Sequence, residues 1–167
     1  MEVNTIILLS EGMEAISVAE IASKLDAADK VLHKLGEHIT TVTLIAPPEQ
    51  LGLDALTMPV VFPDVDNPGF LYSLCKALAP LPCRHTLILS VDDLGLSADH
   101  IGQLLDYSER LPHMSVVSSR DGNLVLPVLL PLDSYQSIQD YLNSQGQATL
   151  MKWLEQSVFV ECERLDS

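Results

Sequence analysis

The sequence predicts an α/β fold of three layers, α/β/α, in which helices cover both faces of a mostly parallel sheet with a C-terminal antiparallel hairpin. Short apolar runs alternate with segments of helical spacing through the first two-thirds of the chain, which is typical of parallel strands joined by helices. The run "HTLILSV" at residues 85–91 is apolar on both faces, as a central parallel strand requires. The tetrapeptide "RDGN" at residues 120–123 contains the Asp-Gly pair that favours a tight hairpin.

The first half of the chain is expected to form three strands and two helices. In chain order these are a strand at 5–9, a helix at 15–35, strands at 40–46 and 58–63, and a short helix at 69–78. The first strand is a run too short for a helix, and the long helix follows from apolar residues three to four positions apart. Gly36 occupies the left-handed position expected after a helix. The second strand is β-branched and is bounded by prolines.

The second half begins with the apolar strand at 85–91. Ser97 is a good N-cap for a helix that continues to Arg110. Strands at 114–119 and 124–131 are expected on either side of the Asp-Gly turn. A helix at 134–143, a short helix with Thr149 as its cap and a strand at 158–165 complete the chain.

The composition limits the classes of function. No apolar run approaches the roughly 18 to 20 residues of a membrane span, and "MEVNTIILLS" at the N-terminus lacks the basic region of a signal peptide, so we expect a cytoplasmic protein. Nine Lys and Arg against 23 Asp and Glu give a formal charge of −14, which argues against nucleic acid as a partner. The chain has no repeat, low-complexity tract or interdomain linker, so residues 1–167 are expected to form a single domain.

The spacing of the cysteines and histidines indicates no metal-binding or catalytic motif. Cys75, Cys83 and Cys162 show no CxxC spacing, and we expect them to be structural. The five histidines show no metal-binding spacing, and no nucleophile elbow GxSxG occurs.

Two adjacent carboxylates, Asp92 and Asp93, directly follow the central strand. In open α/β sheets ligands bind outside the carboxyl ends of the strands, so their position favours a function. Mg²⁺ often takes one or two protein carboxylates together with phosphate oxygens and water. The alternative, which the spacing leaves equally open, is that the aspartates turn the chain toward the next helix.

Three later segments carry a resemblance to a known family. They are "DNPGFLYSLCKAL" at 66–78, "LILSVDDLGLSADHI" at 87–101 and "VVSSRDGNLVLPVLLPLDSYQSIQDYLNSQGQATLMKWLEQ" at 116–156. From Met58 onward, their order and spacing resemble the molybdenum cofactor guanylyltransferases, which have a nucleotidyltransferase-like fold of Rossmann-like type. The resemblance implies that Asp92 is a metal ligand, that Pro68 and Gly69 face the nucleotide and pterin, and that Lys152 helps to face the pterin. It also implies Mg²⁺ and molybdopterin as cofactors.

The N-terminal segment departs from this family. The family has a glycine-rich loop with Arg and Lys around a nucleotide triphosphate, whereas this chain has "IILLSEGMEAISVAE". Gly12 is the single glycine there, no basic residue precedes Lys24, and Glu11 and Glu14 would repel phosphate groups. We therefore expect a tight acidic corner at residues 10–14, and GTP binding is doubtful.

The sequence as a whole suggests a degenerate relative of the guanylyltransferases, without efficient GTP transfer. It would act in molybdenum cofactor binding or biosynthesis, as a cofactor-binding protein or as a partner of a molybdoenzyme or a biosynthetic enzyme. One alternative is an active Mg²⁺-dependent enzyme that moves GMP from GTP to molybdopterin. Another is an acidic structural or regulatory module that meets a basic partner.

Overall fold

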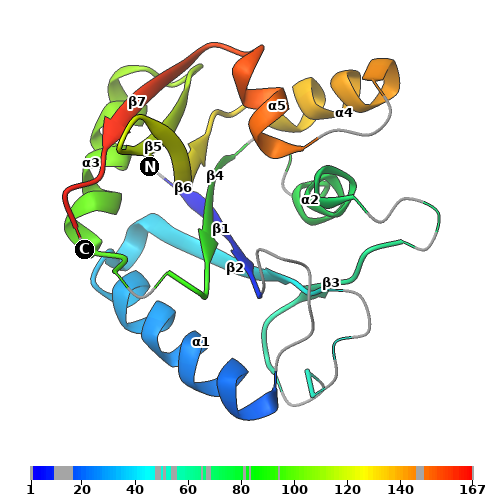
Figure 1. Ribbon diagram of the computed structural model, residues 1–167, viewed down its shortest axis with the longest axis vertical. Helices are drawn as coiled ribbons and strands as arrows, with labels where there is room; N and C mark the ends of the chain where they lie inside the picture. Colours follow the sequence, from blue (N-terminus) through cyan, green and yellow to red (C-terminus); the bar gives the residue numbers. More distant parts are fainter. Residues whose placement is uncertain are drawn as a thin grey trace.

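The computed structural model describes residues 2–9, 17–47, 50, 52–53, 56–64, 66, 69–80, 82, 84–93, 95–145 and 149–166. A seven-stranded sheet runs through the molecule in the order β3-β2-β1-β4-β6-β5-β7 (Figure 1). The strands are β1 (Val3–Leu8), β2 (Ile39–Ile45), β3 (Val60–Val61), β4 (His85–Ser90), β5 (Ser115–Arg120), β6 (Asn123–Leu130) and β7 (Phe159–Glu163).

The sheet is mostly parallel, as predicted. Strands β1 to β4 are parallel, and β7 is parallel to β5. Strand β6 runs antiparallel to both of its neighbours, β4 and β5, and is the single reversed strand among those described. The reversal occurs at Asp121 and Gly122, whose φ angles of 54° and 81° are the two positive values that a two-residue hairpin turn requires. The Asp-Gly prediction is therefore confirmed.

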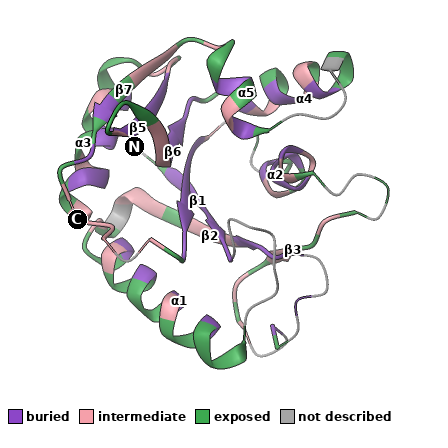
Figure 2. Cartoon of the chain, in the orientation of Figure 1, coloured by how far each residue is buried: buried purple, intermediate pink, exposed green. Residues whose placement is uncertain are grey.

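Helices cover both faces of the sheet, which makes the three predicted layers. They are α1 (Val18–His33), α2 (Phe70–Leu78), α3 (Ala98–Arg110), α4 (Ser134–Gln145) and α5 (Leu150–Glu155). Buried residues of α1 and α3 pack in one cluster against the sheet, and those of α2, α4 and α5 pack in a second cluster on the opposite face. Figure 2 shows β1 and β4 buried between these layers and the outer side of α1 exposed.

Side-chain caps fix where three helices begin. The hydroxyl of Ser17 accepts a hydrogen bond from the Glu20 amide, Ser97 accepts one from His100, and Thr149 accepts one from Lys152. The predicted helix at 15–35 is therefore shorter in the structure, because it begins after Ser17 and ends at His33. Gly36 has the expected positive φ, 59°, and begins a short 3₁₀ turn (Gly36–His38).

The central strand agrees with its prediction, and the last strand is shorter than predicted. Every residue of β4 is buried, as its apolar sequence predicts. Strand β7 ends at Glu163 and not at residue 165, although the Arg164 amide still donates to the carbonyl of Ser119 on β5 at 2.8 Å. Cys75 and Cys162 are buried free thiols, and burial raises the pKa of Cys75 to about 11, which fits a structural role. Cys83 lies outside the described residues. Within the described part of the chain, no helix is long and apolar enough to cross a membrane.

Candidate functional site at the carboxyl edge of the sheet

A tight turn after β4 presents the two adjacent aspartates at the carboxyl edge of the sheet. The Asp92 amide donates to the Ser90 hydroxyl at 3.1 Å, and the Asp93 amide donates to the Ser90 carbonyl at 3.3 Å. The Val91 amide donates to the carbonyl of Leu8 at 3.0 Å, which holds the turn beside the end of β1. The turn prediction is right for the backbone, but both side chains also have partners elsewhere in the chain.

The Asp92 carboxylate forms an ion pair with Lys24 of α1. Lys24 is also 3.8 Å from Glu20 on the same helix. The hydrogen bond to Asp92 raises the pKa of Lys24 above its ordinary value, although burial opposes this. The carboxylate predicted to hold a metal ion is therefore occupied by an internal cation. Its side chain is 40% exposed, so solvent reaches the pair.

The Asp93 carboxylate is bound instead by Arg164, the first residue after β7. Two nitrogens of the guanidinium contact the two Asp93 oxygens, one of them at 3.3 Å. Arg164 also donates to the carbonyl of Leu126 at 2.9 Å. The Arg164 side chain is only 2% exposed, so this is a buried ion pair in which the guanidinium fork is matched by a carboxylate.

Asp166 extends the same network toward α3 and β5. Its Oδ1 accepts from Arg164 Nε at 2.6 Å and from Arg120 at 3.1 Å, and its Oδ2 accepts from the amide and hydroxyl of Ser97 at 3.1 and 3.0 Å. Burial alone would raise the pKa of Asp166, but hydrogen bonds from Arg164 and Ser97, with the Arg164 charge, lower it below its ordinary value. We call Asp93, Arg164, Asp166 and Arg120 the arginine network. With its hydrogen bonds to Ser97 and Leu126, it ties the segment after β7 to the turn after β4 and to α3, β5 and β6.

A buried histidine lies next to the arginine network. His100 of α3 is 4% exposed, and its Nε2 is 2.7 Å from the hydroxyl of Ser118 on β5. The Ser118 hydroxyl donates its one proton to the carbonyl of Pro127 at 2.6 Å. Ser118 must therefore accept from His100, which places a proton on Nε2. Burial lowers the pKa of His100, with smaller opposing effects from Asp166 and Asp93.

The structure gathers some of the predicted site residues and separates others. Gly69 is the N-cap of α2, on the connection that follows the carboxyl end of β3. Lys152 is exposed on α5, which leads into the amino-terminal end of β7, away from Asp92 (Figure 1). Pro68 and the predicted acidic corner at residues 10–14 lie outside the described residues.

Lys24 was not predicted as the partner of Asp92, and no role was predicted for Arg164 or Asp166. Cations are scarce, nine in 167 residues, and Arg164 lies inside the strand predicted at 158–165. That scarcity was the available signal, but no local pattern connects residues about 70 positions apart.

The donor atoms at this edge fit a divalent cation poorly. Asp92 offers one carboxylate, which Lys24 already neutralises, and Asp93 is bound to a buried arginine. Within the described residues, no three His, Cys, Asp or Glu side chains gather where they could hold a metal ion. Mg²⁺ accepts only one or two protein carboxylates when phosphates supply the remaining oxygens, but Lys24 would first have to leave Asp92.

The fold and the strand-end carboxylates define a nucleotidyltransferase-like α/β protein. The chain belongs to the family of the MobA-like NTP transferase domain, whose model matches residues 24–158. No curated protein sequence matches the chain.

Solved structures support the fold. A 2-C-methyl-D-erythritol 4-phosphate cytidylyltransferase from Francisella tularensis matches at a TM-score of 0.70 and 12% identity, over 100% of this chain and 91% of that one. Molybdopterin-guanine dinucleotide biosynthesis protein A from Archaeoglobus fulgidus matches at 0.62 and 12%, over 96% and 83%. A Mycobacterium tuberculosis protein in complex with manganese matches at 0.55 and 11%, over 98% and 89%. At these identities the likeness shows the fold alone.

Proposed function

We propose that this chain is a cytoplasmic member of its family that acts by binding and does not efficiently transfer GMP from GTP. It would serve molybdenum cofactor binding or biosynthesis, by holding molybdopterin or by acting as a partner of another protein in that process. The observation that carries the proposal is the ion pair between Lys24 and Asp92.

The ion pair opposes metal-assisted chemistry for an electrostatic reason. A nucleotidyltransferase needs a divalent cation to neutralise charge on the transferred phosphate. At Asp92 the local negative charge is already balanced by an ammonium group, so a metal ion gains less there than at an unpaired carboxylate. Asp93 is a poor substitute for Asp92, because releasing it would deprive buried Arg164 of one of its two carboxylate partners.

Thermal unfolding with added ligands tests the proposal. We expect GTP with Mg²⁺ at millimolar concentration to leave the melting temperature of the wild-type chain unchanged, and molybdopterin to raise it. A ligand at 100 times its dissociation constant stabilises a protein by about 2.7 kcal/mol, so a true site would be detected. A GTP-dependent rise that Asp92→Asn abolishes would overturn the proposal.

A matched pair of lysine variants tests the role of the ion pair. Lys24→Ala should allow Mn²⁺ to bind at Asp92 more tightly than in the wild type. Lys30→Ala, which removes an exposed lysine of the same helix paired with Asp26, should leave Mn²⁺ binding unchanged. Equal Mn²⁺ affinity in the wild type and in Lys24→Ala would mean that Lys24 does not restrict the site.

The pterin contacts implied by the family resemblance are tested separately. We propose Pro68, Gly69 and Lys152 as these contacts. Lys152 is exposed and makes its cap contact through its backbone amide, so Lys152→Ala should preserve the fold. We expect this variant to lose most of the stabilisation by molybdopterin. An unchanged molybdopterin shift would remove Lys152 from the site.

A second candidate function is an active Mg²⁺-dependent guanylyltransferase that moves GMP from GTP to molybdopterin. It is favoured by the position of Asp92 at the end of β4 and by the 40% exposure of its side chain. It requires Lys24 to move from Asp92 when the metal and nucleotide arrive. Formation of a guanylylated pterin by the wild type, but not by Asp92→Asn, would establish it.

A further inference from the structure

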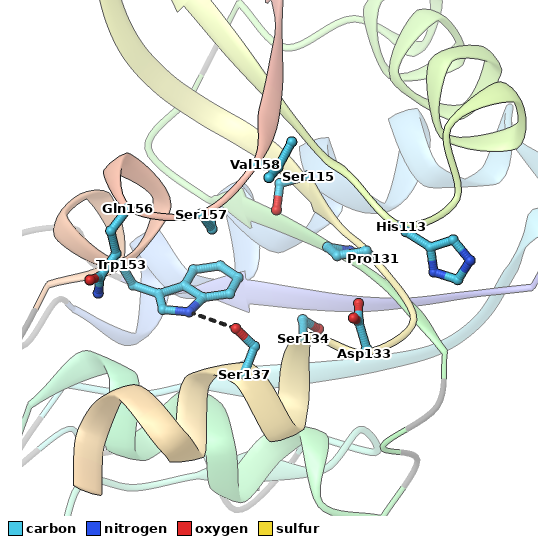
Figure 3. Close-up of a pocket in the computed structure, with 10 residues that line it drawn as sticks. All are labelled: His113, Ser115, Pro131, Asp133, Ser134, Ser137, Trp153, Gln156, Ser157 and Val158. Atoms are coloured by element: carbon cyan, nitrogen blue, oxygen red, sulfur yellow. Dashed lines mark hydrogen bonds between the residues drawn. The ribbon is translucent and has the colours of Figure 1, made fainter. Parts of the chain in front are cut away.

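The amino-terminal edge of the sheet contains a pocket that the proposed function does not use. It has a volume of about 290 Å³ and lies where β5 begins, β6 ends, α4 begins and the chain passes from α5 to β7 (Figure 3). The carboxyl-edge aspartates are at the opposite ends of these strands. A ligand here would therefore bind independently of events at Asp92.

Two serine hydroxyls open into this pocket. Ser115 is 1% exposed and Ser134 is 2% exposed, and both side chains line the pocket. Within the described part of the chain, neither hydroxyl makes a hydrogen bond to another residue. Other unpartnered hydroxyls, such as that of Thr86, are sealed in the core and line no pocket described here. The Ser115 and Ser134 oxygens are not sealed in this way, so they can bond to water or to a ligand that fills the pocket.

The remaining wall combines polar groups with one aromatic ring. Asp133 offers a carboxylate, Gln156 offers an amide that both donates and accepts, and His113 offers a ring nitrogen. Figure 3 shows the indole of Trp153 on the side of the pocket facing Ser134, with its Nε1 bonded to the hydroxyl of Ser137 at 3.2 Å. The wall can therefore both donate and accept several hydrogen bonds beside the indole, which is only 3% exposed.

The charge and size of the pocket narrow the ligand class. No lysine or arginine is among the described residues that line it, and Asp133 is acidic, which disfavours an anion. An ammonium ion only donates, whereas the serine hydroxyls and Gln156 can also donate and need acceptors. The volume is at the lower end of the range for ligand sites, which limits the ligand to about one small ring.

We propose that this pocket binds a neutral, polyhydroxylated molecule of about monosaccharide size. Ser115, Ser134 and Asp133 hydrogen-bond its hydroxyl groups, and the small part of Trp153 that reaches the pocket contacts its carbon atoms. Each ligand hydroxyl donates and accepts, as each serine hydroxyl does, so the two sets satisfy one another.

Trp153 provides a direct measurement, because it is the one tryptophan of the chain. The full-length protein is titrated with glucose, ribose and myo-inositol, and with phosphate and agmatine as charged probes, while tryptophan emission is recorded. We expect a saturable change with at least one of the neutral polyols and none with phosphate. No saturable change with any of the three polyols up to about 100 mM, enough to saturate a millimolar site, would overturn the proposal, as would saturation by agmatine or phosphate alone.

Variants locate the binding. Ser134→Ala and Asp133→Ala should each weaken the polyol by about fivefold, the effect of one lost hydrogen bond. Ser144→Ala, an exposed serine of the same helix whose hydroxyl bonds to Tyr141, should leave the affinity unchanged. If Ser134→Ala fails to fold, the exposed Gln156→Ala replaces it. Equal affinity in the pocket variants and in the Ser144→Ala control would place the binding elsewhere and overturn the proposal.

Discussion

Arg164 is the side chain whose loss should disturb the carboxyl edge most. Arg164→Met keeps a similar length but leaves Asp93, at 16% exposure, without a cation, and leaves Asp166, at 10% exposure, with Arg120 alone. Removing one partner of a buried ion pair costs about 3–5 kcal/mol of unfolding free energy. We expect a loss of this size in urea unfolding at neutral pH.

The matched control is the exposed pair of Lys30 and Asp26 on α1, whose side chains are 75% and 65% exposed. Lys30→Met should change the unfolding free energy by no more than about 1 kcal/mol, because exposed ion pairs contribute little. If the two substitutions cost the same, the arginine network would not be the stabilising feature that its burial indicates.

Two buried histidines predict a pH dependence of stability. Burial lowers the pKa values of His85 and His100 from the ordinary 6.5. Between their folded-state pKa values and 6.5, the unfolded chain binds more protons than the folded one, so stability falls as the pH drops below about 6.5. It stops falling, for these two groups, once the pH is below their folded-state values.

The measurement is urea unfolding at pH 7.5 and at pH 5.5. The double variant His85→Asn with His100→Gln should lose most of the difference between the two conditions, and the exposed His33→Gln should keep it. A wild-type chain with equal stability at both pH values would contradict the histidine argument.

Asp166 affects stability at lower pH. Its lowered pKa contributes stability that is present above pH 3.8, its ordinary pKa, and is lost as the pH falls through the folded-state pKa.

Two glycines with open space around them should respond oppositely to alanine, because their backbones differ. Gly102 lies inside α3, and no atom lies within 4 Å of an added Cβ. Gly102→Ala should stabilise the protein by about 0.5–1 kcal/mol through helix propensity. Gly122 of the β5–β6 turn also has open space but has φ +81°. Gly122→Ala should cost about 1–2 kcal/mol from left-handed strain. Thermal unfolding of both variants checks the opposite signs.

The elements that the sequence predicts best are those with a local cause. The Asp-Gly pair reverses β6, and Ser97 and Thr149 begin their helices as predicted, because each of these signals acts within a few residues. The helix at 15–35 was predicted too long, because its apolar spacing continues past the cap at Ser17. The last strand was also predicted too long by two residues at its end, since β7 ends at Glu163 and the Arg164 side chain turns to Asp93.

At the candidate site, contacts between residues far apart in the sequence could not be predicted from local patterns. The position of Asp92 at a strand end was predictable, because an apolar run ends there and parallel strands end at a common edge. The partner of Asp92 was not predictable, since Lys24 lies 68 residues earlier on a helix face that carries other charged residues. The arginine network likewise joins residues 71 positions apart. Such pairs depend on the strand order β1-β4-β6-β5-β7, which local spacing does not determine.

The charge of the whole molecule should make its stability depend on salt. A formal charge of −14 repels itself more in the compact state than in the expanded unfolded chain. Raising NaCl from about 10 mM to about 100 mM shortens the screening length from about 30 Å to about 10 Å. We expect the melting temperature to rise by several degrees over this range, because the repulsion between distant carboxylates is screened while the buried arginine network is not.

Replacing three exposed acids, by Asp29→Asn, Glu155→Gln and Glu163→Gln together, should raise the melting temperature at low salt and reduce the salt-dependent rise. A melting temperature that falls with salt would mean that attractive ion pairs, such as that of Lys24 with Asp92, outweigh the repulsion.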